Sequence, residues 1–358
     1  MSAPTEDFEK FETPANGSRF FQTCTKATSE STGTVLLRWN YADPYLFNPA
    51  FDPSLILYDS NYCTEVADLN GATDLPTLEY LPRVLQHFDQ KPTVCDIGCG
   101  QGEFVEALRR DGFLATGFDP ALRLDNPYLH PRLWQPQDAE ADLYVMRCVL
   151  PHIPGPWEFV QSLAESSPSS LLLVEYQSID WILEQDMWFL IGHGHVNYFA
   201  MRDFESRFTV LDSGSWADGE WEWVLIQPSS YVPAPPREFA NPEKLRSLLT
   251  VRRNTLASVR SEKRPIALWG AAGKGIILGH ALQESGAMIV GVIDSNPTKW
   301  GTFLESSGIP VLSPTQALEE LPKNTLILVC NPNHFAAVAE VVGESYLVQP
   351  ANRAWEIN

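Results

Sequence analysis

Between residues 75 and 228, short apolar runs alternate with longer segments whose apolar residues recur at helical spacing. Such runs between turn-forming residues predict strands, and a spacing of three to four residues predicts amphipathic helices. One helix is predicted at 75–88, and another directly follows the glycines at 98–102. Strands alternating with helices indicate an α/β fold with a parallel, doubly wound sheet. The predicted strands are PTVCDI (92–97), FLATGFDP (113–120), DLYVMRCVL (142–150) and SLLLVEYQS (170–178).

A second, smaller α/β pattern follows residue 262. Before it, VLDSGSWADGEWEWVLIQP (210–228) has two strand-like runs around a Gly/Asp-rich turn, which predicts a hairpin. The proline-rich stretch 229–244 predicts a linker, and LRSLLTVRRNTLASVRS (245–261) predicts a helix. The chain therefore contains two α/β domains, of which the second is small and Rossmann-like. The strands of this second unit are predicted at 265–270, 288–294, 309–313 and 325–330.

Residues 1–60 form an N-terminal extension in this division. The first 45 residues are polar, and we expect them to be irregular apart from short strand-like pieces such as TVLLRW (34–39). The first α/β domain is predicted at 61–228, the linker with its connecting helix at 229–262, and the second α/β domain at 263–358.

The 358 residues carry a formal net charge of −20, with 44% hydrophobic and 20% charged residues. This composition is ordinary for a globular protein, and its negative charge would repel a polyanion, so we expect no nucleic-acid partner. The acidic start lacks the apolar segment of a signal peptide, and no apolar run reaches membrane-spanning length. We therefore expect a cytoplasmic protein without membrane contact. The cysteines include no C-x-x-C pair and fit free thiols: Cys24, Cys63, Cys95, Cys99, Cys148 and Cys330.

A glycine-rich loop, DIGCGQG, joins the strand at 92–97 to the following helix. Glycines permit positive φ and close approach of a ligand, and the helix N-terminus offers free N–H groups. A dinucleotide-binding loop uses nearly the same residues, and a tight turn with an incidental acid is the structural alternative. Two acids favour S-adenosylmethionine: Asp96 suits a cationic amino group, and Asp119 ends the next strand where ribose hydroxyls need an acceptor. The predicted cofactor-binding residues of the loop are Asp96, Gly98, Gly100 and Gly102, together with Asp119.

Longer segments resemble the sugar C-methyltransferases of deoxysugar pathways. DIGCGQGEFVEAL resembles the cofactor-binding motif of class I methyltransferases, whose sheets also finish with an antiparallel pair. The resemblance covers about residues 55–340 and is most specific in the C-terminal part. It implies a class I methyltransferase domain that binds S-adenosylmethionine, followed by the Rossmann-like domain. The other segments that carry it are VMRCVLPHIPGPWEFV (145–160), VEYQSIDWILEQDMWFLIGHGHVNYFAMRDF (174–204) and LWGAAGKGIIL…GVIDSNPTKWGTFLESSGIPVLSP (268–314).

The stretch HGHVNYFA carries the candidate catalytic residues. In the family that it resembles, Tyr-His-Glu-His precedes the aromatic pair, and the second histidine is the base. Aligned on Tyr198, the resemblance assigns this role to His195, with His193 and Tyr198 as its companions in the catalytic segment. Two positions depart from the family, because Gly192 replaces the tyrosine and Gly194 replaces the glutamate. A carboxylate beside the base would orient it and raise its pKa, so His195 requires a different partner.

Three roles are open for the two histidines. A metal site needs a third ligand, and no nearby Cys, Asp or Glu has ligand spacing, so we expect no metal. Buried histidines satisfied by hydrogen bonds are the second role, but two histidines flanked by glycines are poorly suited to packing. A catalytic or substrate-binding role led by His195 is therefore favoured, with His193 or Glu175 as its partner. Glu175 is also a candidate for binding the substrate.

The resemblance implies methylation of a small molecule, a nucleotide-linked 4-keto-deoxysugar. His195 would remove the proton beside the carbonyl, and the resulting enolate carbon would take the methyl group from the sulfonium. The rate of such a reaction depends mainly on the positioning of the reactants and on the strength of the base, because the leaving sulfur becomes neutral. The same residues also fit O- or N-methylation of another small metabolite, or a protein that binds a nucleotide sugar without catalysis.

The second domain has a glycine loop of its own, GAAGKG, between a strand and a helix. An anion can bind at such a helix N-terminus, and Lys274 supplies a positive charge. Asp294 ends the next strand like a ribose-binding acid. An NAD site is one interpretation and a purely structural lid is another. We favour a surface that binds the nucleotide or sugar, with Gly273, Lys274 and Asn331 as the substrate-binding residues.

The family begins with a cysteine-rich zinc-binding module, whereas this chain has only Cys24 and Cys63 ahead of the strand at 92–97. The comparison implies that the zinc site is absent and that residues 1–60 take its place. Tyr58 and Tyr62 resemble the aromatic segment that covers the cofactor, and we assign Tyr62 to cofactor binding. A half-buried core tyrosine is the alternative.

Overall fold

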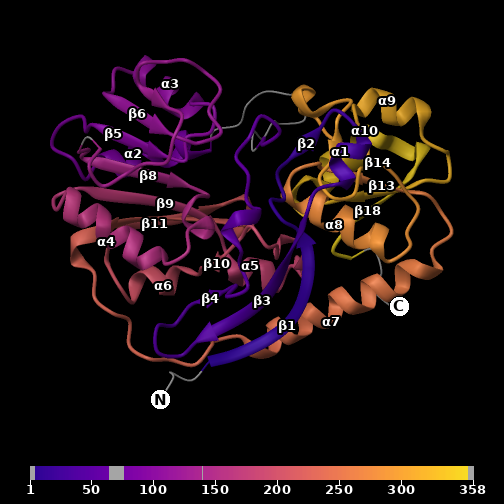
Figure 1. Cartoon of the computed structure of the whole chain (residues 1–358), viewed down its shortest axis with the longest axis horizontal. Coiled ribbons are helices and arrows are strands. Elements are labelled where there is room, and N and C mark those ends of the chain that lie inside the picture. The colour runs from indigo at the N-terminus through magenta and orange to yellow at the C-terminus, as the bar shows by residue number, and fades with distance from the viewer. Residues whose placement is uncertain (1–4, 64–75, 139, 354–358) are drawn as a thin grey trace.

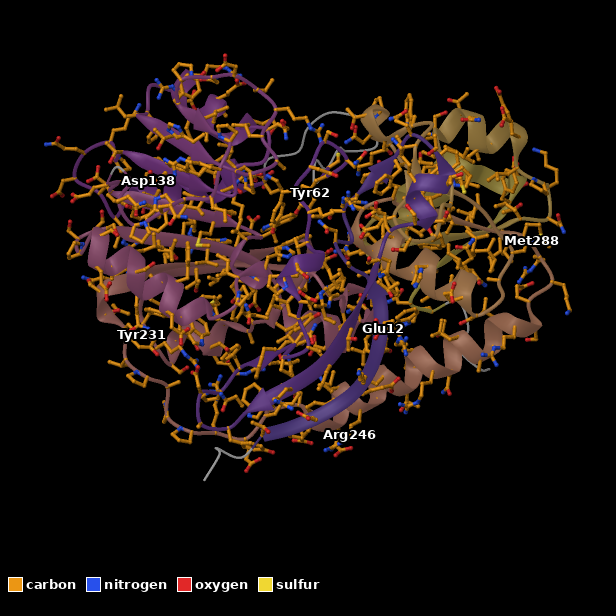
Figure 2. All side chains as sticks on the ribbon, viewed as in Figure 1. Glu12, Tyr62, Asp138, Tyr231, Arg246 and Met288 are labelled. Carbon is orange, nitrogen blue, oxygen red and sulfur yellow. The ribbon has the colours of Figure 1, made fainter. Side chains whose placement is uncertain are left out.

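The computed structural model describes residues 5–63, 76–138 and 140–353. Residues 1–4 of the predicted N-terminal extension and residues 354–358 of the predicted second domain lie outside the described residues. So does residue 75, the first residue of the helix predicted at 75–88. Figure 1 shows two α/β domains side by side, with the long strand β1 (Thr5–Pro14) between them. Side chains fill both domains and the space around β1 (Figure 2).

The first domain is built on a seven-stranded sheet in the order β7-β6-β5-β8-β9-β12-β11. Strands β5 to β9 run parallel, whereas β12 is antiparallel to both of its neighbours, β9 and β11. A parallel sheet that ends in an antiparallel pair is the arrangement of class I methyltransferases, so the predicted fold is confirmed. The strands are β5 (Val94–Ile97), β6 (Ala115–Phe118), β7 (Leu129–His130), β8 (Leu143–Arg147), β9 (Leu171–Gln177), β11 (Thr209–Trp216) and β12 (Trp221–Gln227).

Successive residues of the central strands face opposite sides of this sheet. In β8, Val145 packs into a cluster with α2 and α3, whereas Tyr144 packs into a cluster with α4 and α6. Strands that are covered on both faces read as continuous apolar runs, which is the pattern seen in the sequence. The helices of this domain are α2 (Thr77–Leu85), α3 (Glu103–Arg110), α4 (Pro156–Ser166), α5 (Ile179–Glu184) and α6 (Met201–Glu205).

The second domain has a five-stranded parallel sheet in the order β16-β14-β13-β17-β18. Helix α8 (Gly273–Glu284) covers one face, and α9 (Pro314–Glu320) and α10 (Phe335–Val342) cover the other. This confirms the Rossmann-like prediction, and the sheet has one strand, β18, that the sequence did not predict. The strands are β13 (Ile266–Trp269), β14 (Ile289–Ile293), β16 (Val311–Leu312), β17 (Leu326–Val329) and β18 (Leu347–Pro350).

The N-terminal segment contributes to a four-stranded antiparallel sheet with β1, β3 (Thr32–Asn40), β4 (Leu46–Phe47) and β10 (Asn197–Tyr198). The expectation of an irregular start is therefore wrong for β1. Its pairing with β3 shifts register between Asp7 and Lys10. Such a bulge breaks the alternation of buried and exposed residues by which a strand is recognised in a sequence.

Helix α7 (Pro242–Ser258) follows the linker and lies along β1 (Figure 1). Arg246 forms an ion pair with Glu6, and Arg252 contacts Glu9 at 3.2 Å. The pair of Arg246 is half-exposed, and such ion pairs contribute little stability. The contact therefore depends mainly on the apolar side of α7, where Leu245 is fully buried in a cluster that extends into the second domain.

Residues 20–28 connect the N-terminal segment to the second domain. Strand β2 (Phe20–Phe21) pairs with β15 (Phe303–Leu304), and α1 (Cys24–Thr28) packs beside this pair. One cluster of buried side chains continues from the N-terminal sheet through Trp188 to Leu304. The N-terminal segment thus joins both domains, and the pairing of β4 with β10 fixes the segment that carries the histidines.

Candidate functional site

The first glycine loop lies between β5 and α3, at the carboxyl edge of the parallel strands. Gly98, Gly100 and Gly102 have φ values of 77°, 60° and 95°, which glycine adopts without steric cost. The loop is also crowded, because a Cβ atom on Gly98 would lie 2.2 Å from Cγ2 of Val149. The loop thus brings the N-terminus of α3 to the sheet edge where open α/β sheets bind their ligands.

Asp119 follows β6 and is tied to this loop. Its Oδ2 accepts a hydrogen bond from the N–H of Gly100 at 3.0 Å, and its Oδ1 accepts one from the N–H of Ala121 at 2.7 Å. Burial raises the pKa of this carboxyl group. A carboxylate has about four acceptor positions, so two remain for a ligand. The geometry fits the hydroxyl groups of a ribose.

Asp96 is fully buried in β5. Its Oδ2 accepts a hydrogen bond from Nη2 of Arg147 at 3.1 Å, whereas its Oδ1 has no partner among the described residues. Burial raises the pKa of Asp96 and outweighs the opposing effect of Arg147. A buried acceptor without a partner costs free energy. The site therefore fits a ligand that supplies a charged donor, such as the amino group of S-adenosylmethionine.

Tyr58 and Tyr62 form an edge-to-face pair with ring centres 5.0 Å apart. Burial raises the pKa of both hydroxyl groups, and the nearby carboxylate of Asp119 raises it further. Figure 2 places Tyr62 between the two α/β domains. The structure thus brings the predicted aromatic segment to Asp119 and the first glycine loop.

His193 is fully buried, and other parts of the chain satisfy both of its ring nitrogens. Nδ1 donates to the carbonyl oxygen of Thr34 at 2.8 Å, and Nε2 accepts a hydrogen bond from the N–H of Asp52 at 3.2 Å. Phe51 stacks on the ring with centres 5.2 Å apart. Gly33 provides the space, since a Cβ atom there would lie 2.3 Å from Cγ of His193. His193 therefore anchors the stretch HGHVNYFA (residues 193–200), called the histidine segment below, to β3.

The neighbour of His195 is a histidine that the sequence analysis did not single out. The ring of His152 lies edge-on to that of His195 with centres 4.6 Å apart. Nδ1 of His152 lies 2.6 Å from the carbonyl oxygen of Gly194, to which it donates. Burial lowers the pKa of His195 to about 3, and His152 is the second cause. His195 is therefore a neutral imidazole beside a second neutral imidazole.

The structure explains why a glycine occupies position 194. A Cβ atom there would lie 2.9 Å from the carbonyl oxygen of Asn16, which is backbone and cannot turn away. The turn at Asn16 is itself fixed, because Glu305 accepts hydrogen bonds from the N–H groups of Asn16 and Gly17 at 2.9 and 3.0 Å. The N-terminal segment thus leaves no space for a side chain such as the family's glutamate.

Tyr198 and Glu175 have partners other than His195. The hydroxyl of Tyr198 donates to the carbonyl oxygen of Gly192 at 3.2 Å and accepts a hydrogen bond from its N–H at 3.1 Å. The carboxylate of Glu175 accepts a hydrogen bond from Tyr80 at 2.5 Å. Burial raises the pKa of Glu175. The structure therefore places Tyr198 within the histidine segment, where its ring lies edge-on to that of His195, whereas Glu175 forms its hydrogen bonds with residues of α2.

The second glycine loop meets a carboxylate of the first domain. Glu220, fully buried between β11 and β12, forms an ion pair with Lys274 at the start of α8. Asn331 and Asn333 each donate to the other oxygen of Glu220 at 3.1 Å. Two of the predicted substrate-binding residues, Lys274 and Asn331, thus bind a side chain of the protein itself. The third, Gly273, lies beside Gly17, whose carbonyl oxygen would be 3.6 Å from an added Cβ.

Asp294 repeats the geometry of Asp119 in the second domain. Its Oδ2 accepts a hydrogen bond from the N–H of Ala271 in the glycine loop at 2.7 Å, and its Oδ1 accepts one from Asn296 at 2.8 Å. Lys299 lies 3.6 Å from the same carboxylate. The shared arrangement follows from the shared order of strand, glycine loop, helix and strand.

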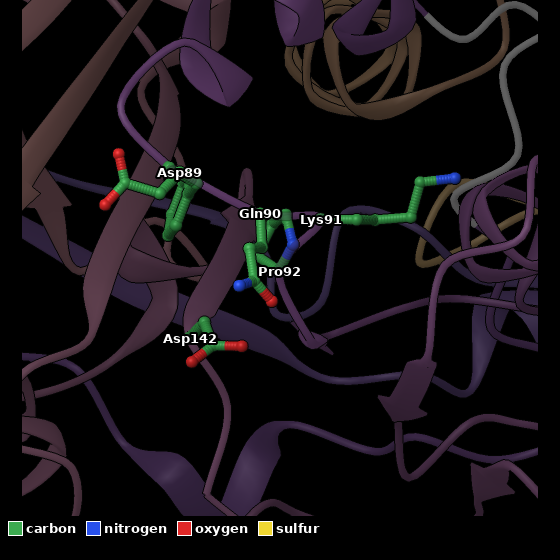
Figure 3. Close-up of a pocket in the computed structure, with 6 residues that line it drawn as sticks. Asp89, Gln90, Lys91, Pro92 and Asp142 are labelled. Atoms are coloured by element: carbon green, nitrogen blue, oxygen red, sulfur yellow. The ribbon is translucent and has the colours of Figure 1, made fainter.

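A surface pocket at the opposite edge of the first sheet is not part of this site. Figure 3 shows its lining residues, which come just before β5 and β8 in the chain and so lie at the amino ends of these strands. The glycine loop follows β5 and lies at the carboxyl ends. Ligands of open α/β sheets bind at the carboxyl ends. The pocket is lined by Phe88, Asp89, Gln90, Lys91, Pro92 and Asp142.

Within residues 5–63, 76–138 and 140–353, no group of three or more His, Cys, Asp or Glu side chains is arranged to hold a metal ion. None of the helices in this part of the chain combines the length and the apolar character that crossing a membrane requires.

Sequence reasoning missed four residues of this region: Arg147, His152, Glu220 and Glu305. His152 lies in the segment VMRCVLPHIPGPWEFV that carried the family resemblance, so its position after a predicted strand was an available signal. Arg147 ends the same strand. Glu220 and Glu305 gave no local signal, because their roles depend on contacts with distant parts of the chain.

Two domain families match the chain. Residues 73–211 match the family described as Methyltransferase domain, and residues 239–340 match the family described as C-methyltransferase C-terminal domain. A search of curated proteins finds no match. The order of the two matches agrees with the order of the two sheets.

Solved structures with similarity to the chain include three proteins. The PH0226 protein from Pyrococcus horikoshii OT3 is 14% identical over 45% of this chain and 94% of its own, with a TM-score of 0.33. Magnesium protoporphyrin IX methyltransferase from Synechocystis PCC 6803, with bound SAM, is 17% identical over 42% and 78%, with a TM-score of 0.31. The 1,6-didemethyltoxoflavin-N1-methyltransferase from Burkholderia thailandensis is 12% identical over 40% and 73%, with a TM-score of 0.31.

The seven-stranded sheet has the class I order, and most of it lies within the matched methyltransferase region. The chain is therefore an S-adenosylmethionine-dependent methyltransferase in which a methyltransferase domain is followed by a C-methyltransferase C-terminal domain.

Proposed function

We propose that this enzyme methylates a carbon atom beside the carbonyl group of a nucleotide-linked 4-keto-deoxysugar. The match of residues 239–340 to a C-methyltransferase C-terminal domain is the observation that carries the choice of carbon. The resemblance of 145–160 and 174–204 to deoxysugar C-methyltransferases supports the class of substrate.

The first glycine loop holds the cofactor in this proposal. When bound, S-adenosylmethionine supplies a methyl group on a positively charged sulfur. Asp119 binds the ribose hydroxyls, for which its hydrogen bond to Gly100 orients it. Asp96 binds the amino group through its unpartnered Oδ1. Tyr62 covers the site, with Tyr58 packed against its ring.

His195 is the general base. It accepts the proton from the carbon beside the substrate carbonyl, and the electron pair left on that carbon takes the methyl group. A base must be unprotonated to act, and burial keeps His195 neutral by lowering its pKa to about 3. The negative charge of the forming enolate, or of a nucleotide diphosphate, raises the pKa of a nearby imidazole and so strengthens the base during the reaction.

His152 takes the place of the family's glutamate as the neighbour of the base. Its hydrogen bond to Gly194 fixes its ring against that of His195. His193 anchors the same segment through Thr34 and does not contact substrate in this mechanism.

The substrate-binding assignments are revised in the same proposal. Lys274 and Asn331 hold Glu220, so binding of a nucleotide phosphate by these residues requires that contact to open. Gly273 borders the turn at Gly17 and contributes backbone to the substrate side. Glu175 supports the site indirectly, because it fixes Tyr80 through a hydrogen bond.

Two measurements test the proposal. The first is mass spectrometry and NMR of the product from S-adenosylmethionine and a panel of keto-sugar nucleotides, for which we expect one new C-methyl group. The second is deuterium exchange in D₂O with S-adenosylhomocysteine in place of the methyl donor, for which we expect exchange at the carbon beside the carbonyl. A methyl group on oxygen or nitrogen, or the absence of any acceptor in the panel, contradicts the proposal.

The exchange reaction also tests His195 directly. His195→Ala should reduce exchange about 10²–10⁴-fold, which is the usual effect of a positioned base. His87→Ala, at an exposed position after α2, is the matched control and should exchange like the wild type. Equal exchange by both variants would remove His195 from the mechanism.

A further inference from the structure

Residues 13–17, called the N-terminal strap below, pack against the start of the histidine segment. The strap begins at the end of β1, which lies between the two domains (Figure 1). Oγ1 of Thr13 accepts a hydrogen bond from the N–H of His193 at 2.9 Å. The carbonyl oxygen of Asn16 lies against Gly194, where it would be 2.9 Å from an added Cβ atom. The strap therefore contacts the backbone directly before the proposed base.

A carboxyl group of the second domain holds the end of this strap. Glu305 directly follows β15 and is almost completely buried. Its Oε1 accepts a hydrogen bond from the N–H of Asn16 at 2.9 Å, and its Oε2 accepts one from the N–H of Gly17 at 3.0 Å. Water cannot replace these hydrogen bonds, because the carboxyl group is buried. The position of the strap therefore depends on Glu305.

The contact continues from the strap to the ring of the base. Gly194 meets the strap at its Cα atom, and its carbonyl oxygen accepts a hydrogen bond from Nδ1 of His152 at 2.6 Å. The His152 ring in turn lies edge-on to that of His195, with centres 4.6 Å apart. A displacement of the strap would therefore move Gly194 and, with it, both imidazole rings.

We propose that Glu305 is a positioning residue for His195, and that it acts from the second domain through the N-terminal strap. The inference rests on the proposed function, in which His195 is the base. A base must lie within hydrogen-bond distance of the proton that it removes, and a displacement of about 1 Å can cost about 100-fold in rate. The second domain thus takes part in proton transfer as well as in substrate binding.

A purely structural role for Glu305 leads to different measurements. If Glu305 only stabilises the contact between the strap and the second domain, its loss lowers the fraction of folded protein, and each folded molecule works at the normal rate. If Glu305 positions the base, each folded molecule removes the proton more slowly, whereas its affinity for the cofactor is unchanged. The rate per binding site and the cofactor affinity therefore distinguish the two roles.

Deuterium exchange in D₂O with bound S-adenosylhomocysteine provides the first test. The acceptor is the keto-sugar nucleotide that the wild type exchanges fastest, and calorimetric titration counts the sites that bind S-adenosylhomocysteine. Glu305→Ala should slow exchange per site about 10–100-fold and leave the affinity for S-adenosylhomocysteine unchanged. Glu305→Gln keeps one acceptor oxygen, so it should show a smaller loss of the same kind, and it serves if the alanine variant does not fold.

Ser306→Ala is the matched control in the same turn. The hydroxyl of Ser306 donates to the carbonyl oxygen of Ser31 at 3.3 Å, outside the strap, so this variant should exchange like the wild type. Wild-type exchange in the Glu305 variants, or a loss of cofactor affinity as large as the loss of exchange, overturns this inference and leaves the proposed function standing. Absence of exchange in the wild type overturns both.

A double-mutant cycle provides the second test, because coupling through a series of contacts needs direct evidence. His152→Ala removes the ring between Gly194 and the base. If Glu305 acts through this series, Glu305→Gln should slow exchange much less in the His152→Ala background than in the wild type. Losses that multiply to within about twofold, as independent sites show, overturn the inference.

Discussion

Nδ1 of His152 lies 2.6 Å from the carbonyl oxygen of Gly194, and this hydrogen bond sets the His152 ring edge-on to His195. The backbone of the histidine segment thus positions one imidazole by holding its neighbour. A glutamate at position 194 would clash with Asn16, so the pair of rings is the solution compatible with this N-terminal segment.

Replacement of His152 should change the pH dependence of catalysis. His152 is the second cause of the low pKa of His195, after burial. His152→Gln removes a neighbour that disfavours the protonated form, so the pKa of His195 should rise. Because the base acts only when neutral, the acid limb of the rate profile should move to higher pH. The profile of His87→Gln should match the wild type, and an unmoved acid limb in His152→Gln would exclude the coupling.

Gly33 and His193 should be energetically coupled. A Cβ atom on Gly33 would lie 2.3 Å from Cγ of His193, so Gly33→Ala should lower the free energy of unfolding by about 1–3 kcal/mol. In the His193→Ala background the same change should cost almost nothing, because the clashing ring is gone. Urea denaturation of the four proteins measures the coupling. Gly273→Ala, which meets only an ordinary 3.6 Å contact, is the control, and additive effects of the two changes would contradict the packing.

Most of the fold could be read from the sequence, because parallel strands covered on both faces leave continuous apolar runs. The glycine loop and Asp119 could also be predicted, since they are adjacent in the order of strand, loop and helix. His193 was expected to join the catalytic residues, yet its position opposite Gly33 depends on a glycine about 160 residues earlier in the chain. Its hydrogen bond to Thr34 joins two residues that are 159 positions apart in the sequence. No local pattern reports such a contact.

The contact between the domains shows the same limit. GAAGKG with Lys274 predicted a site for an external anion, and the local geometry is indeed that of an anion site. The anion in the structure is Glu220, which lies 54 residues away in sequence. A loop sequence specifies that a negative charge binds there, but only the tertiary fold determines whether that charge comes from a ligand or from the protein.

Removal of Lys274 should destabilise the protein strongly. Glu220 is almost completely buried, and Lys274→Met would leave its charge without a counter-ion, at a cost of about 3–5 kcal/mol. The double variant Lys274→Met/Glu220→Gln should recover part of this loss, because no unpaired charge remains. Lys244→Met breaks an exposed pair with Glu184 and should cost less than about 1 kcal/mol in the same denaturation experiment. Equal losses in the free energy of unfolding for Lys274→Met and Lys244→Met would show that the buried contact stabilises the protein no more than the exposed one.

Glu305 should make stability depend on pH. Burial raises its pKa from 4.5 to about 7 in the folded protein. The folded protein therefore binds this proton more tightly than the unfolded chain, so the contribution of Glu305 to stability is complete below pH 4.5 and is lost as the pH rises to about 7.

Glu305→Gln should remove this contribution. The difference in free energy of unfolding between wild type and variant should fall between pH 4.5 and 7 and level off above. Glu12→Gln, exposed on β1, should keep the slope of the wild type. A difference that stays constant with pH would mean that Glu305 titrates normally.

The pairing of β2 with β15 has a consequence for synthesis on the ribosome. Phe20 and Phe21 emerge early, but their partners Phe303 and Leu304 are made more than 280 residues later. At about 5–20 residues per second, the unpaired edge of β2 waits roughly 15–60 s for its partner. During this interval an apolar strand is available to wrong partners, which makes the nascent chain a candidate client for chaperones. Moving the first 30 residues to the end of the second domain would shorten this interval, although it changes the order of the segments in the chain.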